Sequence, residues 1–235
     1  MDWNALIEFD KQLLLAVNGS DSLFLDGLVK TLTTAATWIP LYVSLFYLVL
    51  KNNDTVQKVM LIVGCALLCV FVAGSLDDMV VKPLVARWRP TRDPEIGLLV
   101  DVVNGYRGGN YGFFSAHASN TFSLAVFFSL LIRSRLLSVF LVGWSLLNCW
   151  TRMYLGVHYP GDILVGLLWG GIVGTAVWLL HHRIMAGTST GSQTSFVSSQ
   201  YTPTGYQTAD VDVVISVLVF TLVYAVLRAS LYIYA

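Results

Sequence analysis

The stretch TRMYLGVHYPGD, residues 151–162, places an arginine, a histidine and an aspartate between two long apolar runs. These runs, residues 136–154 and 163–180, have the length and composition of membrane-spanning helices, which need about 20 largely apolar residues. Ionisable side chains at the edge of hydrocarbon are costly unless they have a partner or a function. The stretch therefore predicts a turn between two membrane helices that carries part of a functional site.

The composition supports a membrane protein. Of the 235 residues, 56% are hydrophobic and 12% are charged, whereas soluble domains are about 45–50% apolar and about 25% charged. The formal net charge is zero, which gives no reason to expect a nucleic-acid partner. The cysteines lie in apolar runs without metal-binding spacing and are expected to pack as small hydrophobic residues; they are Cys65, Cys69 and Cys149.

Hydropathy along the chain predicts an all-α fold, a polytopic membrane bundle of about six transmembrane helices. The candidate spans are residues 32–50, 56–76, 118–132, 136–154, 163–180 and 213–234. Residues 1–20 lack a signal-peptide pattern and have apolar positions at helical spacing, which fits an interfacial helix or a simple packing helix. The rest of the chain divides into a helical core, a flexible linker and a C-terminal transmembrane helix, at residues 21–185, 186–210 and 211–235.

Alternation of the helices places the chemically suggestive residues on one side of the membrane. Loops at 51–58, 133–135 and 181–210 fall on the first side, and residues 77–117 and 152–162 fall on the second. Basic residues are almost equally numerous on the two sides, so the positive-inside rule alone does not orient the chain. If an anionic ligand holds the basic residues of the second side, the first side is cytoplasmic. The expectation is then a multi-pass inner (plasma) membrane protein whose active site is extracytoplasmic.

The segment KPLVARWRP, residues 82–90, contains a candidate phosphate site. If the segment is largely helical, the seven-residue offset between Lys82 and Arg89 is almost two turns and puts both cations on one face. Arginine offers a bidentate fork and lysine a compact charge, which together suit an anion with several oxygens. The alternative is a juxtamembrane basic cluster that contacts lipid headgroups.

The segment FFSAHASNTF, residues 113–122, ends a glycine-rich loop and begins an apolar helix. Ser115 is placed to cap this helix, and the free amides around Ala116 and His117 can bind an oxyanion at the positive helix end. His117 could donate a proton to a leaving oxygen, because histidine titrates near physiological pH. The alternative is ordinary capping and interface packing.

The opening stretch supplies a third group of residues. Asp162 follows His158 by four residues, a spacing that lets the carboxylate accept a hydrogen bond from one imidazole nitrogen and leave the other free to attack. Arg152 ends the preceding helix and faces the same loop. The alternative is a structural His–Asp pair that caps the helix, with Arg152 as an interface anchor.

Two other kinds of catalytic site are not expected. The chain has no cluster of histidines and carboxylates at ligand spacing on this side, so no metal site is predicted. A serine hydrolase is disfavoured, because Ser115 lies near His117 without the GxSxG turn that exposes a nucleophilic serine.

Together, the three segments resemble the type 2 phosphatidic-acid phosphatase superfamily of integral membrane lipid phosphatases. The family signature reads KxxxxxxRP, then PSGH, then SRxxxxxHxxxD, and the chain carries its charged and titratable positions in the same order and spacing. The resemblance covers roughly residues 20–182. Phe114, Ala116 and Thr151 stand where the family has proline, glycine and serine, and the alanine narrows the backbone freedom at the phosphate cradle.

The resemblance implies a two-step phosphoryl transfer without a metal or another cofactor. His158 would attack phosphorus to form a phosphohistidine, Asp162 would hold it in position, and His117 would protonate the leaving group. The charge on the phosphate oxygens would be stabilised by Lys82, Arg89, Arg152, Ser115 and the backbone at Ala116.

The implied partners are the bilayer and a lipid phosphate that enters from it. Undecaprenyl pyrophosphate is the preferred expectation, because Arg92 and Arg107 add cations that could meet a second phosphate. Phosphates of lipid A, phosphatidylglycerol phosphate and phosphatidic acid are alternatives. Vanadium-dependent haloperoxidases use the same signature, but they are soluble enzymes and do not fit several spans. A non-enzymatic lipid-phosphate binding or transport protein would need the cations but not both histidines and Asp162.

Overall fold

The computed structural model of the chain describes residues 3–188 and 199–232, and within them every regular element is a helix. Short turns η1 (Ala35–Trp38), η2 (Asp77–Val81), η3 (Pro90–Arg92) and η4 (Val103–Gly105) connect or extend the helices. The α-helices are α1 (Trp3–Val17), α2 (Leu23–Thr33), α3 (Ile39–Lys51), α4 (Val56–Leu76), α5 (Lys82–Val85), α6 (Ala116–Ile132), α7 (Arg135–Tyr154), α8 (Pro160–Thr188) and α9 (Thr208–Tyr232).

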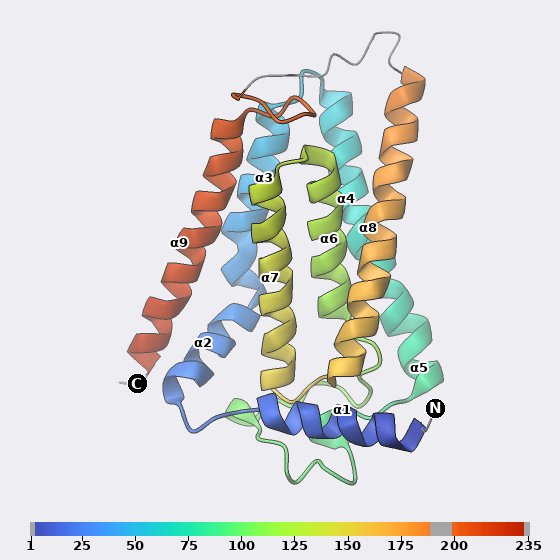
Figure 1. The fold of residues 1–235 in the computed structure, drawn as a ribbon, viewed down its shortest axis with the longest axis vertical. Helices are drawn as coiled ribbons and strands as arrows, with labels where there is room; N and C mark the ends of the chain where they lie inside the picture. Colours follow the sequence, from blue (N-terminus) through green and yellow to red (C-terminus); the bar gives the residue numbers. More distant parts are fainter. Residues whose placement is uncertain (1–2, 189–198, 233–235) are drawn as a thin grey trace.

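The long helices run side by side along the longest axis of the molecule, and α1 lies across one end of them (Figure 1). Helix α6 packs against α4, α7 and α8, while α9 packs on α2 and α3 at the other edge. The interior of the bundle is apolar, with fully buried side chains such as Leu48, Phe127 and Leu141. Loops at the α1 end carry the polar motifs of the sequence, so the core positions the site without forming it.

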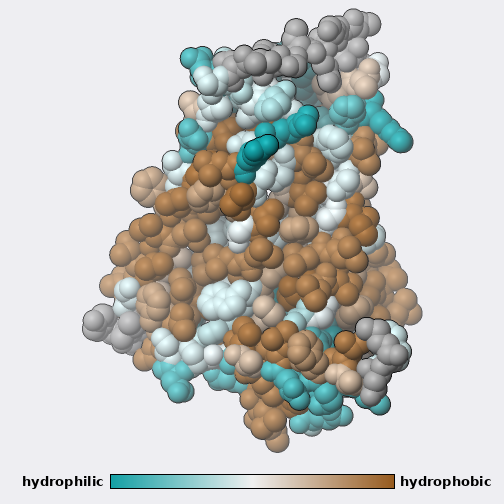
Figure 2. All heavy atoms as spheres, viewed as in Figure 1, coloured by the Kyte–Doolittle hydropathy of each residue, from teal (hydrophilic) through white to brown (hydrophobic). Residues whose placement is uncertain are grey.

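The expected all-α membrane bundle is confirmed, although the count of six spans is not reached. Four helices are long and apolar enough to cross a membrane, or five with the pair α2 and α3, among the residues described. Helix α6, with 17 residues, is a shorter apolar helix. Figure 2 shows the apolar residues as a broad band across the middle of the molecule, with hydrophilic residues gathered toward the two ends.

The span expected at residues 32–50 is two helices bent by 67°. Thr34 is extended at the break, and Pro40 follows in the first turn of α3, where a missing N–H costs no intrahelical hydrogen bond. Trp38 fixes the bend, because its indole N–H donates to Leu32 O over 2.7 Å. Hydropathy alone does not register this bend, since both halves are apolar.

The helices on either side of the expected linker are longer than the predicted boundaries, since α8 ends later than residue 185 and α9 begins earlier than residue 211. Helix α8 continues to Thr188, and part of the linker expected at residues 186–210 lies outside the described residues. Within the described part, Tyr201 and Gln207 pair across a turn that leads into α9. Asp210 accepts hydrogen bonds from Tyr47 and Asn52, so the final helix is tied to α3 near its first turn.

Three glycines bring α8 unusually close to α6. A Cβ atom at Gly166, Gly170 or Gly174 would lie 2.7, 2.5 or 2.5 Å from a carbonyl oxygen of α6 or its cap, distances that real Cβ atoms do not tolerate. The four-residue spacing puts all three on one face of α8, as in small-residue contacts between other membrane helices. This contact holds together the N-terminal ends of α6 and α8, where His117 and Asp162 lie.

Substitution Gly170→Ala is expected to destabilise the protein by about 1–3 kcal/mol, because the added methyl group meets the backbone of α6. The neighbouring substitution Gly171→Ala is the matched control, since its Cβ would meet only the Phe122 ring at 3.4 Å. Thermal unfolding in detergent compares the two variants with the parent protein. Equal midpoints for Gly170→Ala and Gly171→Ala would contradict the proposed tight contact.

Candidate active site

The three motif segments meet at the end of the bundle covered by α1. Residues 87–89 pair with residues 110–112 of the glycine-rich loop, where Arg89 N–H donates to Asn110 O and Gly112 N–H donates to Arg87 O, each over 2.9 Å. The start of α6 is joined to the start of α8, because Ser115 N–H donates to Asp162 O over 3.1 Å. Backbone hydrogen bonds between distant segments therefore assemble the site.

The expectation of a two-turn helix across Lys82 and Arg89 is wrong. Helix α5 ends at Val85, and Ala86 adopts a left-handed conformation with φ 48°. Arg89 is extended with φ −68° and ψ 149°, because a residue that precedes proline is disfavoured in the α region. Lys82 thus lies at the start of α5, and Arg89 lies in an extended segment. Tertiary contacts, and not a shared helical face, place the two side chains at the site.

The two central residues of the site are buried side by side. His158 is 2% exposed and its Nδ1 lies 3.5 Å from Oδ2 of the fully buried Asp162. This distance is at the long limit of a hydrogen bond, and the same oxygen already accepts the Tyr159 N–H over 3.0 Å. The carboxylate is therefore fixed by its own loop and faces one nitrogen of the imidazole.

Arg89 faces the other nitrogen of His158. Its Nη1 lies 3.2 Å from His158 Nε2 and 3.2 Å from Val157 O, and its Nε donates to Tyr111 O over 3.1 Å. An arginine only donates, so this contact requires a lone pair on Nε2 and leaves the proton of a neutral imidazole on Nδ1, toward Asp162. Burial lowers the pKa of His158 to about 4; Asp162 opposes this shift, and the charges of Arg89 and Lys82 add to it.

Arg152 and His117 form the opposite wall of the site. Arg152 is 3% exposed, and its Nη1 lies 3.4 Å from His117 Nε2. The phenol of Tyr106 faces the same guanidinium, yet Nε and Nη2 of Arg152 have no hydrogen-bond partner among the described residues. Buried donors without partners are costly, so these two N–H groups point to an anion that binds here.

Ser115 acts as the N-cap of α6, as its position in the sequence predicts. Its hydroxyl accepts the Ala118 N–H over 3.4 Å, and the side chain is fully buried. His117 follows in the first turn of α6 and is exposed. The helix end that carries Ala116 and His117 therefore opens toward the space between Arg152 and His158, where its partial positive charge favours an anion.

Asp77 is a site residue that the sequence reading missed. It is fully buried, and its Oδ2 lies 2.7 Å from Lys82 Nζ while its Oδ1 accepts the Phe114 N–H over 3.0 Å. Asp78 also pairs with Lys82, from a more exposed position. Asp77 thereby joins the first motif to the loop that precedes α6. Its position inside an apolar run, directly before the basic segment, is the signal that could have identified it.

Arg87, Asp10 and Gly112 were also missed. Arg87 pairs with Asp162 Oδ1 over 2.8 Å and with Asp10 Oδ2 over 2.7 Å, and so connects the site to α1. Gly112 lies against the His–Asp pair, because a Cβ there would be 3.3 Å from Asp162 Oδ2. Arg87 could have been identified as a further cation within the first motif, whereas nothing in the sequence around Asp10 indicates this contact.

The remaining candidates lie outside the central group. Arg107, proposed to meet a second phosphate, is exposed and donates from Nη1 to Thr91 O over 2.8 Å, and Arg92 is also exposed. Within residues 3–188 and 199–232, no group of three or more His, Cys, Asp or Glu side chains has a metal-site arrangement. The central group consists of two histidines with their arginine neighbours.

Asp77→Ala is expected to lower the free energy of unfolding by about 3 kcal/mol, because it removes one partner of a buried ion pair and the acceptor for Phe114 N–H. Asp78→Ala removes a carboxylate that is 62% exposed from the same lysine and is expected to change stability by about 0.5 kcal/mol or less. Thermal unfolding of the two variants side by side tests this difference. Equal losses would show that Asp77 has no special structural role.

Comparisons with known proteins identify the family of the chain. Residues 58–186 match the PAP2 superfamily. The chain is 42% identical over 183 residues to a lipid A 4'-phosphatase of Bacteroides thetaiotaomicron, covering 77% of this chain and 80% of the relative. It is 33% identical over 176 residues to a lipid A 4'-phosphatase of Porphyromonas gingivalis, covering 75% of this chain and 74% of the relative. No solved structure matches the chain.

The matched region includes all three motif segments and four of the long helices, so it covers the site and most of its scaffold. Family membership, an apolar helical bundle and a cluster of histidines with arginines agree on one class of enzyme. The chain belongs to the PAP2 superfamily and is a membrane lipid phosphatase, a hydrolase of phosphoric esters.

Proposed function

We propose that the enzyme hydrolyses a phosphate monoester of lipid A and that the reaction passes through a phosphohistidine intermediate on His158. The observation that carries the mechanism is the placement of His158 between Asp162 and Arg89, with an unprotonated Nε2 next to a cation that can bind phosphate. The pKa of His158, lowered to about 4 mainly by burial, keeps this imidazole neutral and nucleophilic at neutral pH.

In the first step, Nε2 of His158 attacks phosphorus and the bond from phosphorus to the sugar oxygen breaks. His117 acts in its protonated, imidazolium form, which the negative charge of the bound phosphate favours. It donates its extra proton to that oxygen, which leaves as an alcohol, and His117 becomes neutral. The proton on Nδ1 stays on the ring, so the phosphorylated imidazole carries a positive charge that Asp162 stabilises from 3.5 Å. Arg89 moves its hydrogen bond from Nε2 to a phosphate oxygen as the substrate binds.

In the second step, a water molecule gives a proton to His117 and attacks the phosphohistidine. The bond from phosphorus to nitrogen breaks, inorganic phosphate leaves, and both histidines return to their starting state. Charge on the equatorial oxygens is stabilised by Arg89, Lys82 and the two unpartnered N–H groups of Arg152. Positioned cations supply most of the catalytic effect in such transfers.

The relatives favour lipid A over undecaprenyl pyrophosphate as the substrate. Two lipid A 4'-phosphatases align with about three quarters of the chain, including every motif segment. The argument for a diphosphate depended on Arg92 and Arg107, which lie exposed, and Arg107 already donates to a backbone carbonyl. A monoester needs only the central cations. By the same relatives, we assign the 4'-phosphate as the group removed.

A lipid-facing groove provides a place for an acyl chain. It has a volume of about 630 Å³ and lies between α6 and α8, lined by apolar residues that include Phe122, Val126, Leu168 and Gly171. Phe122 is five residues past His117, which corresponds to about 8 Å along the helix. An acyl chain in this groove would leave its phosphorylated headgroup at the cations.

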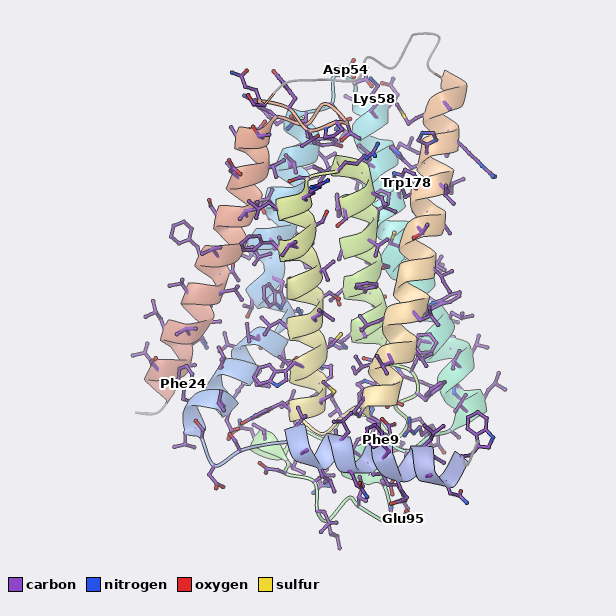
Figure 3. All side chains as sticks on the ribbon, in the orientation of Figure 1. Phe9, Phe24, Asp54, Lys58, Glu95 and Trp178 are labelled. Atoms are coloured by element: carbon purple, nitrogen blue, oxygen red, sulfur yellow. The ribbon has the colours of Figure 1, made fainter. Side chains whose placement is uncertain are left out.

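The active site is proposed to face the extracytoplasmic side. Lys58 and Asp54 lie at the opposite end of the bundle from Phe9 of α1 and Glu95 (Figure 3). In the proposed mechanism, the basic residues of that opposite end do not bind the substrate, so they count fully under the positive-inside rule and support a cytoplasmic location of that end. They are Lys51, Lys58, Arg133, Arg135 and Arg183.

Phosphate release by the purified protein in detergent tests the proposal. The lipids to compare are lipid A, undecaprenyl pyrophosphate, phosphatidylglycerol phosphate and phosphatidic acid, with mass spectrometry to identify which phosphate of lipid A is lost. We expect the highest kcat/KM with lipid A and a loss of at least about 1,000-fold in His158→Ala, because the nucleophile is removed. The acid-quenched enzyme should carry an acid-labile phosphate on His158.

Two results would contradict the proposal. Turnover by His158→Ala would exclude the phosphohistidine mechanism, whereas binding of lipid phosphates without turnover by the parent protein would favour a binding or transport protein. Preference for another lipid, with activity lost in His158→Ala, would keep the mechanism and change the substrate.

Filling the groove is expected to weaken lipid binding without affecting the chemistry. In Gly171→Leu, the side chain would enter the groove beside Phe122 with ordinary contact, and the KM for lipid A should rise several-fold. Hydrolysis of para-nitrophenyl phosphate, which has no acyl chain, should stay within about twofold of the parent rate. Gly64→Leu on α4, where a Cβ meets no atom within 4 Å, is the matched control. Equal KM values in the two variants would exclude the groove.

A further inference from the structure

We propose that Asp10, on the N-terminal helix α1, is a positioning residue of the phosphatase: acting through Arg87, it preserves the negative charge that Asp162 presents to His158. This inference rests on the proposed role of His158 as the nucleophile. It extends the site to a helix that lies across the end of the bundle and outside the region matched to the family (Figure 1).

The geometry is a continuous chain of ion pairs. Arg87 Nη2 lies 2.7 Å from Asp10 Oδ2, and Arg87 Nη1 lies 2.8 Å from Asp162 Oδ1. The other oxygen of Asp162 faces His158 Nδ1 at 3.5 Å. Side-chain exposure is 15% for Asp10, 25% for Arg87 and 0% for Asp162, so the chain of ion pairs ends at a fully buried carboxylate. The guanidinium also lies 4.2 Å above the ring of Tyr159, which restricts its movement.

Charge balance explains why a second carboxylate is needed. When Nε2 of His158 bonds to phosphorus, the imidazole ring becomes positive in a site that already contains Arg89, Arg152 and Lys82. Without Asp10, Asp162 and Arg87 form a neutral pair, which would compensate the positive charge of the phosphorylated imidazole only weakly. With Asp10 included, the two carboxylates and one guanidinium carry a net charge of −1. Asp10 therefore offsets Arg87 and leaves the charge of Asp162 available to the ring.

A second contact places Asp10 against the start of α8. Its Oδ1 accepts the Gly161 N–H over 2.8 Å, directly before Asp162 in the sequence. A Cβ at Gly161 would lie 2.8 Å from Asp10 Oδ2, so a larger residue there would displace this carboxylate. One carboxylate thus holds both the backbone that carries Asp162 and the cation that binds it.

Helix α1 is fixed in this position by contacts apart from Asp10. Leu14 is fully buried, Gly19 N–H donates to Tyr154 O over 3.0 Å, and Lys11 pairs with Glu95. Loss of the Asp10 charge is therefore expected to leave α1 in place, which allows an electrostatic role to be separated from a structural one.

Asp10→Asn tests the proposal, because asparagine keeps an oxygen that can accept the Gly161 N–H but removes the charge next to Arg87. With lipid A in detergent micelles, kcat should fall on the order of tenfold, while KM stays within about twofold and the unfolding midpoint is unchanged. Asp10→Glu should restore part of kcat, since it returns the charge. Glu8→Gln removes a carboxylate that is 60% exposed from the same helix and is the matched control, with kcat near the parent value.

A double-mutant cycle identifies the route of the effect. Arg87→Gln should lower kcat by itself, and adding Asp10→Asn to it should change kcat by less than about twofold, because the cation through which Asp10 acts is gone. A full tenfold loss in both backgrounds would overturn the inference, as would an unchanged kcat in Asp10→Asn or a loss confined to KM and stability.

The inference and the proposed function fail in different ways. An unchanged kcat in Asp10→Asn beside an inactive His158→Ala overturns the inference alone. Full activity in His158→Ala overturns the phosphohistidine mechanism and the role of Asp10 with it.

Discussion

Helix α8 can lie on α6 at backbone distance only because three glycines leave no side chain between them, and the position of the site depends on this contact. The two helices begin at the same end of the bundle, so a close approach along their length also brings together their N-terminal turns. Ser115 N–H then reaches Asp162 O, and His117 faces the loop that carries His158. The apolar scaffold therefore sets the separation of the two histidines.

The site concentrates positive charge where a membrane protein would otherwise avoid it. Lys82 is balanced by Asp77 and Asp78, and Arg87 is balanced by Asp10 and Asp162. Arg89 donates to backbone carbonyls, and Arg152 retains buried N–H groups without partners in the described part of the chain. The ion pairs of Lys82 and Arg87 hold segments of the site together, and in the proposed mechanism Arg89 and Arg152 provide most of the attraction for a phosphate. Among the cations of the site, the two without a carboxylate partner within residues 3–188 and 199–232 are therefore Arg89 and Arg152, which the substrate is proposed to contact.

Sequence reasoning predicted the helical bundle, because long apolar runs and short residue spacings are local signals. Apolar runs of membrane length identify α4, α7, α8 and α9, and the spacing from His158 to Asp162 places both at one turn. The expectation of a helix over residues 82–89 was wrong, because Pro90 and pairing with the glycine-rich loop override helical periodicity there. Sequence reasoning did not include Asp10 and Asp77 in the site, because tertiary contacts determine their partners.

The position of α1 also bears on how the protein is made. Asp10 precedes Gly161 in the chain, and their contact joins positions 151 residues apart. Between them lie most of the membrane helices, which must insert before the two can meet. The site is therefore completed late in biogenesis, after α7 has inserted and the first turn of α8 has reached α1. A nascent chain that stalls before this point would be anchored in the membrane but catalytically incomplete.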